Sequence, residues 1–169
     1  MMKEEMTVRK AVPGDLDAVS ALFRSAIAVM DESGIPQWDE VYPAESDFKN
    51  DIEKGQMFLC EYGSRVAAVF VLNRQRDGEY QNGAWRFDED GSAELHRLCV
   101  DPAFQNRGVG AQTVRLAEAL LRERSTESVR LDAFSKNPYA LRLYEKLGYR
   151  RVGEANFRKG LFYLYEKRL

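Results

Sequence analysis

Residues 94–110 constrain the fold of this chain more than any other stretch, because a strand pattern, a glycine-containing loop and a helix pattern follow one another there. An apolar strand is predicted over Ala93–Val100, the loop runs over Gln105–Gly110, and an amphipathic helix is predicted from Ala111 to about Arg124. Glycine lets a backbone turn tightly and approach a ligand closely. A helix N-terminus presents unpaired N–H groups and a positive dipole end. The stretch therefore predicts a socket for a phosphate or pyrophosphate, to which Arg107 adds a positive charge.

The glycine spacing separates the families that use such a socket. A P-loop requires G-x-x-x-x-G-K-[ST], which the chain lacks, and a dinucleotide-binding loop requires a third glycine where Thr113 stands. The spacing present is Q-x-x-G-x-G, from Gln105 to Gly110, after a strand that ends in Val-Asp-Pro. This motif resembles the acyl-CoA pyrophosphate loop of the GNAT superfamily of acyl-CoA-dependent N-acyltransferases.

A second motif follows a strand predicted over Val129–Phe134. Asn137 suits a helix N-cap, Pro138 suits the first helical position, and Gly148 suits the position that ends the helix. Tyr144 falls on the apolar face of this helix, so one interpretation is a core tyrosine that packs against the sheet. The apolar face consists of Ala140, Leu143, Tyr144 and Leu147.

The same helix carries N-x-x-A-x-x-x-Y-x-x-x-G-Y, which is similar to the last signature block of the GNAT superfamily. The resemblance implies that Tyr144 lies near the acyl-CoA sulfur and donates a proton to the departing thiolate. It also implies that Asn137 faces the pantetheine arm, and that backbone groups near Leu98 and Val100 pair with the pantetheine amide as an added strand would. The cofactor-binding residues implied are Leu98, Val100, Gln105, Asn106, Arg107, Gly108, Val109, Gly110 and Asn137.

An acceptor amine is protonated near neutral pH and must lose a proton before it attacks a thioester. Glu94, at the start of the fourth strand, resembles the general base of some superfamily members, although a solvated glutamate at a strand entrance is the alternative. His96 lies two residues on and therefore points to the same face, so it is a second candidate for the base or for part of a water chain. Arg97 is expected on the opposite face.

The remaining patterns predict a mixed central sheet of about seven strands with helices on both faces, of class α/β (α+β), in one domain over residues 1–169. The resemblance adds a split between strands four and five, in which the cofactor lies. The further predicted elements are strands over Met6–Val12, Met57–Tyr62, Val66–Leu72, Arg150–Asn156 and Leu161–Lys167, a helix capped by Asp15 that ends at Ser33-Gly34, and a short helix over Ala44–Lys54.

Acceptor specificity is expected in the first pair of helices, in the Ile35–Pro43 loop and in the long polar loop of residues 74–92. Trp38, Tyr80 and Trp85 are candidates to line an aromatic acceptor pocket. The alternative is an acidic, solvated loop with hydrophobic anchors. Superfamily acceptors include amines of small molecules and of proteins.

Composition excludes several other classes. A formal net charge of −2 does not favour nucleic acid or an anionic membrane as a partner. No apolar run approaches the roughly 20 residues of a spanning helix, and Met1–Glu5 has no apolar leader region. Cys60 and Cys99 are expected as free buried thiols, and with a single histidine a metal cluster is improbable. We expect a cytoplasmic monomer or homodimer.

The resemblance thus predicts an N-acetyltransferase that moves an acetyl group from acetyl-CoA, with no metal, to a primary amine. The transfer would be direct, in a ternary complex. The alternative is a non-catalytic acyl-CoA sensor or interaction module. Such a binder requires the pyrophosphate loop but has no need of Glu94 or Tyr144.

Overall fold

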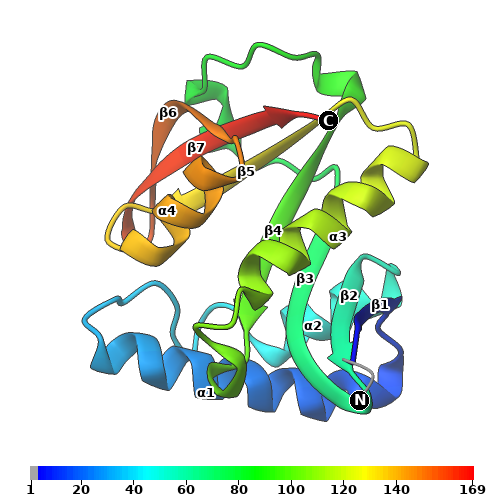
Figure 1. Cartoon of the computed structure of the whole chain (residues 1–169). Coiled ribbons are helices and arrows are strands. Elements are labelled where there is room, and N and C mark those ends of the chain that lie inside the picture. The colour runs from blue at the N-terminus through cyan, green and yellow to red at the C-terminus, as the bar shows by residue number, and fades with distance from the viewer. Residues whose placement is uncertain (1–3) are drawn as a thin grey trace. The chain divides into compact units, whose positions relative to one another are not determined.

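A computed structural model describes residues 4–169 (Figure 1). Met1–Lys3, which belong to the segment considered above for a leader, lie outside the described residues. Residues 4–169 contain a mixed seven-stranded sheet in the order β1-β2-β3-β4-β5-β7-β6, so the predicted fold class is confirmed. The strands are β1 Met6–Lys10, β2 Met57–Tyr62, β3 Arg65–Asn73, β4 Ser92–Val100, β5 Ser128–Phe134, β6 Arg150–Phe157 and β7 Gly160–Arg168. The helices are α1 Leu16–Glu32, α2 Glu45–Glu53, α3 Val109–Glu123 and α4 Pro138–Lys146.

The chain divides into two compact units, each of which contains two separate segments of sequence. The first unit contains the residues up to Leu72 together with Arg97–Leu116, and the second contains Asn73–His96 together with Ala117–Leu169. The chain passes from one unit to the other at the end of β3, again within β4 and a third time within α3.

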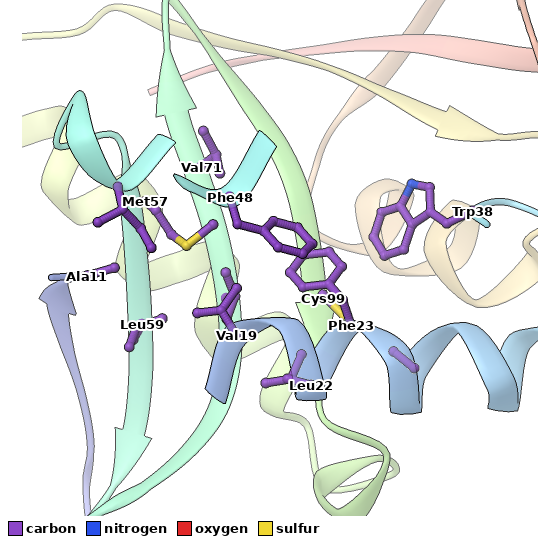
Figure 2. Close-up of a cluster of buried hydrophobic side chains, with 13 residues drawn as sticks. Ala11, Val19, Leu22, Phe23, Trp38, Phe48, Met57, Leu59, Val71 and Cys99 are labelled. Carbon is purple, nitrogen blue, oxygen red and sulfur yellow. The ribbon is translucent and has the colours of Figure 1, made fainter. Parts of the chain in front are cut away.

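An apolar cluster holds the first unit together (Figure 2). The buried stripe of α1 contributes Phe23, whose ring centroid lies 4.4 Å from that of Phe48 on α2 and 5.4 Å from that of Trp38. Burial of one such side chain contributes about 1.5–3 kcal/mol. The other buried members are Ala11, Val19, Leu22, Ala26, Ile52, Met57, Leu59, Val69, Val71 and Cys99.

Helices cover both faces of the sheet within the first unit. Successive residues of a strand point to opposite faces, and Leu59 packs in the cluster with α1 and α2 whereas its neighbour Cys60 meets Thr113 of α3. Burial raises the pKa of the Cys60 thiol to about 11. Cys60 and Cys99 are both free and buried, as predicted.

Both ends of α4 match the sequence prediction, and the start of α1 matches it in position but not in its hydrogen bonds. Asn137 Oδ1 accepts a hydrogen bond from Ala140 N at 3.1 Å, and Gly148 has φ +92°. Asp15 stands at the N-cap position of α1, as predicted, but its side chain makes no cap hydrogen bond to the helix. Its carboxylate instead accepts from Val12 N at 2.7 Å and pairs with Arg9 at 2.8 Å. The reason is a 3-10 turn over residues 13–15 before α1, which Asp15 closes.

Several other element ends differ from prediction by one or two residues. β1 ends at Lys10 rather than Val12, and α3 begins at Val109 rather than Ala111. The loop of residues 74–92 ends one residue early, because Ser92 already belongs to β4. Such differences of one or two residues are normal at element ends.

β5 forms an antiparallel ladder with β7 in the second unit, β6 pairs with β7, and β4 runs parallel to β5 over Ser92–Glu94. The segment of residues 74–91 crosses this sheet. Tyr80 packs with Ala155 and Leu164, and Ala84 N donates to Val152 O at 2.8 Å. This segment contains two short 3-10 turns and is otherwise irregular.

The close approach of this segment to β6 requires a glycine at position 153. A Cβ on Gly153 would lie 2.9 Å from Asn82 O and 3.0 Å from Gly83 Cα. We predict that Gly153→Ala destabilises the protein by about 1–3 kcal/mol, since backbone atoms must move. Thermal unfolding would report this as a loss of about 2–4 °C per kcal/mol. Gly78→Ala, where no atom lies within 4 Å, is the control. Equal melting temperatures in the two variants would contradict the prediction.

Candidate active site

β4 carries the candidate base and changes course where the chain passes between units. Arg97 has φ +50°, an uncommon conformation for a residue other than glycine. The alternation used to place side chains from sequence therefore applies only as far as His96. In the first unit, Arg97 Nη1 lies 3.3 Å from Asp51 Oδ2, and the guanidinium lies over the Tyr42 ring at 5.4 Å. Neither this bend nor this ion pair follows from a local sequence pattern.

The predicted cofactor loop is an exposed turn in the first unit. Asp101 accepts from Ala103 N at 2.9 Å and so starts a 3-10 turn before the loop. Asn106 and Gly108 have φ +62° and +73°, and α3 begins at Val109. Left-handed residues before a helix direct backbone N–H groups toward a common point, which suits an anion. Residues 105–108 are exposed, whereas Val109 is buried.

Aromatic and basic side chains surround the residues that support this loop. The Phe104 ring lies 5.7 Å from the Tyr62 ring, and the guanidinium carbons of Arg65 and Arg107 lie 4.8 Å and 5.9 Å from its centroid. Tyr62 also donates to Gln112 Oε1 at 3.0 Å, which fixes the first turns of α3 against β2. The loop is therefore supported by aromatic side chains and has two positive charges beside it. Leu98 and Val100, the other residues proposed on β4, are half-buried.

In the second unit, Glu94 is fully buried at 0% exposure. Its Oε1 accepts from Arg76 Nε in an ion pair, and Oε2 has no hydrogen-bond partner among residues 4–169. Burial raises the pKa of Glu94 to about 7, against the opposing effect of the Arg76 charge. A carboxyl group with a pKa near the working pH suits a general base.

His96 is held by the segment that leads away from β3. Its Nε2 lies 3.1 Å from Gln75 O. A carbonyl oxygen can only accept, so Nε2 carries the hydrogen in this contact. That nitrogen then has no lone pair with which to accept a proton from an amine.

Tyr144 lies on the buried stripe of α4, as its spacing predicted, and is 6% exposed. Its ring meets Tyr149 edge-on at 5.6 Å and lies 6.2 Å from Tyr165 of β7. Burial raises the pKa of the phenol above its ordinary value, and the charge of Asp132 adds to this effect. The hydroxyl therefore keeps its proton at neutral pH and can act as a donor.

The predicted acceptor residues fall in different units. Trp38 is 8% exposed in the core of the first unit. In the second unit, Trp85 Nε1 donates to Tyr80 O at 2.6 Å, and the Arg130 guanidinium lies 4.5 Å from the Trp85 ring centroid. Tyr80 itself is 2% exposed. Its hydroxyl donates to Asp132 Oδ2 at 2.8 Å.

Asp132 is a site residue that the sequence analysis did not single out. Burial raises its pKa to about 6, and the hydrogen bond from Tyr80 opposes this. Asp132 follows Arg130 by two positions, and Arg130 is paired in register with Glu94, so all three side chains share one face of the sheet. The sequence pattern that could have pointed to Asp132 is the polar pair Arg130 and Asp132 within the otherwise apolar strand β5.

Two features bear on other functions. Within residues 4–169, no group of three His, Cys, Asp or Glu side chains is arranged to hold a metal ion. Nor does any helix in the described part of the chain have the length and apolar character needed to cross a membrane.

A sequence profile of the acetyltransferase (GNAT) family matches residues 24–149, which is most of the chain and includes both signature motifs. The chain belongs to the GNAT family. This confirms the resemblance drawn from the Gln105–Gly110 loop and from the helix that carries Tyr144.

Relatives and solved structures agree with this membership. The chain is 27% identical over 146 residues to the uncharacterized N-acetyltransferase YesJ of Bacillus subtilis, covering 85% of this chain and 81% of YesJ. A GNAT-family acetyltransferase from Streptococcus agalactiae superimposes with a TM-score of 0.84 at 23% identity, over 97% of this chain and 95% of that one. YncA from Salmonella typhimurium, solved with acetyl-CoA, superimposes with a TM-score of 0.71 at 18% identity, over 98% of this chain and 94% of YncA. The two structural likenesses establish the fold.

Proposed function

We propose that this protein transfers an acetyl group from acetyl-CoA to a primary amine of a small molecule or protein, directly and within a ternary complex. The observation that carries the proposal is that one unit contains both a fully buried Glu94 carboxyl, whose Oε2 has no hydrogen-bond partner among residues 4–169, and a buried Tyr144 phenol. Glu94 is then the general base, and Tyr144 is the general acid.

The cofactor is assigned to the exposed Gln105–Gly110 turn, whose residues 106 and 108 are left-handed and whose Arg107 is exposed. The N-terminus of α3 adds unpaired N–H groups for the pyrophosphate. Backbone groups near Leu98 and Val100, and Asn137 at the cap of α4, are assigned to the pantetheine arm. Acetyl-CoA in YncA supports the choice of cofactor.

The chemistry follows from the two ionisable groups. The acceptor ammonium gives one proton to Glu94, and the free amine attacks the thioester carbonyl to form the C–N bond. The C–S bond then breaks, and Tyr144 supplies a proton to the departing sulfur. Holding the two reactants together supplies much of the remaining rate.

The acceptor side is assigned to the two loops that carry Trp38, Tyr80 and Trp85. Tyr80 and Trp85 are supported by their contacts to Asp132 and Arg130, which place polar groups beside aromatic ones. Because Tyr80 and Trp38 are largely buried, we assign them to shaping the acceptor region. Trp85, which is half-buried, is the one assigned to contact the acceptor.

Acetyl-CoA binding should depend on the glycines of the loop. We predict that Gly110→Val weakens acetyl-CoA binding roughly 10-fold or more, because the added side chain blocks close backbone approach. Titration calorimetry would measure the affinity, with circular dichroism to verify folding. Gly14→Val in the same unit, where no atom lies within 4 Å, is the matched control. Unchanged affinity in a folded Gly110→Val variant would remove the cofactor assignment.

The general acid can be tested without disturbing the packing of α4. We expect Tyr144→Phe to retain acetyl-CoA affinity while the rate of transfer falls ~10²–10⁴-fold, since phenylalanine keeps the ring but not the proton. Thiol release against a panel of amines measures the rate. Tyr139→Phe, on the exposed side of the same helix, is the control. Wild-type turnover in Tyr144→Phe would assign Tyr144 to the core alone.

The base assignment predicts a particular pH dependence. Because Glu94 must be deprotonated to accept the proton, kcat/KM should fall as pH drops below about 7. Glu94→Gln should lower the neutral-pH rate ~10²–10⁴-fold and abolish this limb, with partial recovery at high pH as the amine loses its proton in solution. His96→Asn should change little. If His96 proved essential and Glu94 dispensable, the base would be His96. If the wild-type protein bound acetyl-CoA but turned over no amine, the non-catalytic sensor would be favoured instead.

A further inference from the structure

Arg76 makes an unusual set of contacts for a loop arginine. Its Nε donates to Glu94 Oε1, its Nη1 donates to Glu89 Oε1 at 2.8 Å, and its Nη2 donates to Glu89 O at 2.8 Å. Nη2 also approaches Ser92 O at 3.3 Å. One guanidinium thus joins the start of β4 to the segment of residues 74–91, and all three of its nitrogens are engaged.

The two carboxylate partners of Arg76 differ in burial. The Glu94 side chain is 0% exposed and that of Arg76 is 18% exposed, whereas that of Glu89 is 65% exposed. Water screens an exposed ion pair strongly, so the charge of Arg76 acts mainly on Glu94. The contacts to Glu89 and to the two backbone carbonyls fix the plane of the guanidinium.

This arrangement occupies one oxygen of Glu94 and leaves the other unengaged. Oε1 is held by Arg76, while Oε2 is buried with no hydrogen-bond partner in residues 4–169. We propose that Arg76 is a positioning residue that orients the Glu94 carboxylate so that Oε2 receives the proton of the acceptor amine. This inference rests on the proposed function, in which Glu94 is the base.

Arg76 also sets how readily Glu94 ionises. Burial raises the pKa of Glu94, and the charge and hydrogen bond of Arg76 are the strongest influences that lower it. Removing Arg76 should therefore raise the Glu94 pKa above its present value of about 7. The other groups that act on or lie beside Glu94 are Arg74 and Tyr80 from the segment after β3, Arg130 from β5, and His96 on the same face of β4.

Arg74 provides a matched comparison. It lies on the same segment and donates to the carbonyls of Ser92 and Asp90 but not to Glu94. Its charge lowers the Glu94 pKa less than those of Arg76 and Arg130. If the arginines only hold the segment in place, Arg74→Gln and Arg76→Gln should behave alike.

The first experiment titrates the Glu94 side-chain carboxyl by ¹³C NMR in the ligand-free protein, with the resonance assigned by its absence in Glu94→Gln. We expect the midpoint to rise by about 1 pH unit or more in Arg76→Gln. A smaller rise is expected in Arg76→Lys, which keeps the positive charge but not the planar guanidinium. Little change is expected in Arg74→Gln. An unchanged midpoint in Arg76→Gln would overturn the inference. If Arg76→Gln fails to fold, the comparison of Arg76→Lys with Arg74→Gln decides.

The second experiment follows kcat/KM from roughly pH 5.5 to 9.5 on an amine found by the panel. In Arg76→Gln the acidic limb of the pH profile should move to higher pH by as much as the NMR midpoint does. In Arg76→Lys the limb should move less. A rate lowered equally at every pH, as in a loosened segment, would overturn the positioning role. If Glu94→Gln keeps full activity, the base assignment fails. If it is inactive while the limb of Arg76→Gln stays fixed, only the role of Arg76 fails.

Discussion

The burial of charge on one face of the second unit's sheet is the constraint on which the candidate site depends. Glu94, Arg130 and Glu166 are each at most 5% exposed, and an unpaired buried charge is costly. The segment of residues 74–91 supplies the partners: Arg76 binds Glu94, Phe87 O accepts from Arg130, and Arg86 N donates to Glu166. The irregular segment is held in place by the contacts that satisfy these groups, and the same contacts hold the proposed base, Glu94.

The two units differ in the kinds of side chain that they bury. The first has an apolar cluster centred on Phe23, and its Gln105–Gly110 turn is supported by Phe104 and the first turns of α3. Arg65 and Arg107 lie over the Phe104 ring of this support. The second unit buries polar groups, so its electrostatics are sensitive to each partner. This division agrees with the proposed function, in which the first unit holds the cofactor and the second moves protons.

β4 runs from one unit to the other through a single strained residue, Arg97. Glu94 belongs to one unit, and Leu98 and Val100 belong to the other. The positive φ of Arg97 between them costs roughly 1–3 kcal/mol, which its contacts with Asp51 and Tyr42 help to offset. Bends of this kind in strands often redirect side chains next to functional sites. The strain is therefore consistent with a strand that must serve both units.

Sequence alone determined what depends on local spacing, and the tertiary structure decided what depends on distant partners. The Gln105–Gly110 turn, the Asn137 cap and the apolar stripe beneath Tyr144 follow from turn chemistry and helical periodicity, so they were predictable. The ion pair of Arg76 with Glu94 spans 18 residues, and the hydrogen bond of Tyr80 to Asp132 spans 52. No local pattern encodes which side chains meet across such separations. Only the folded sheet buries Glu94 beside Arg76 and Arg130, and this burial raises its pKa.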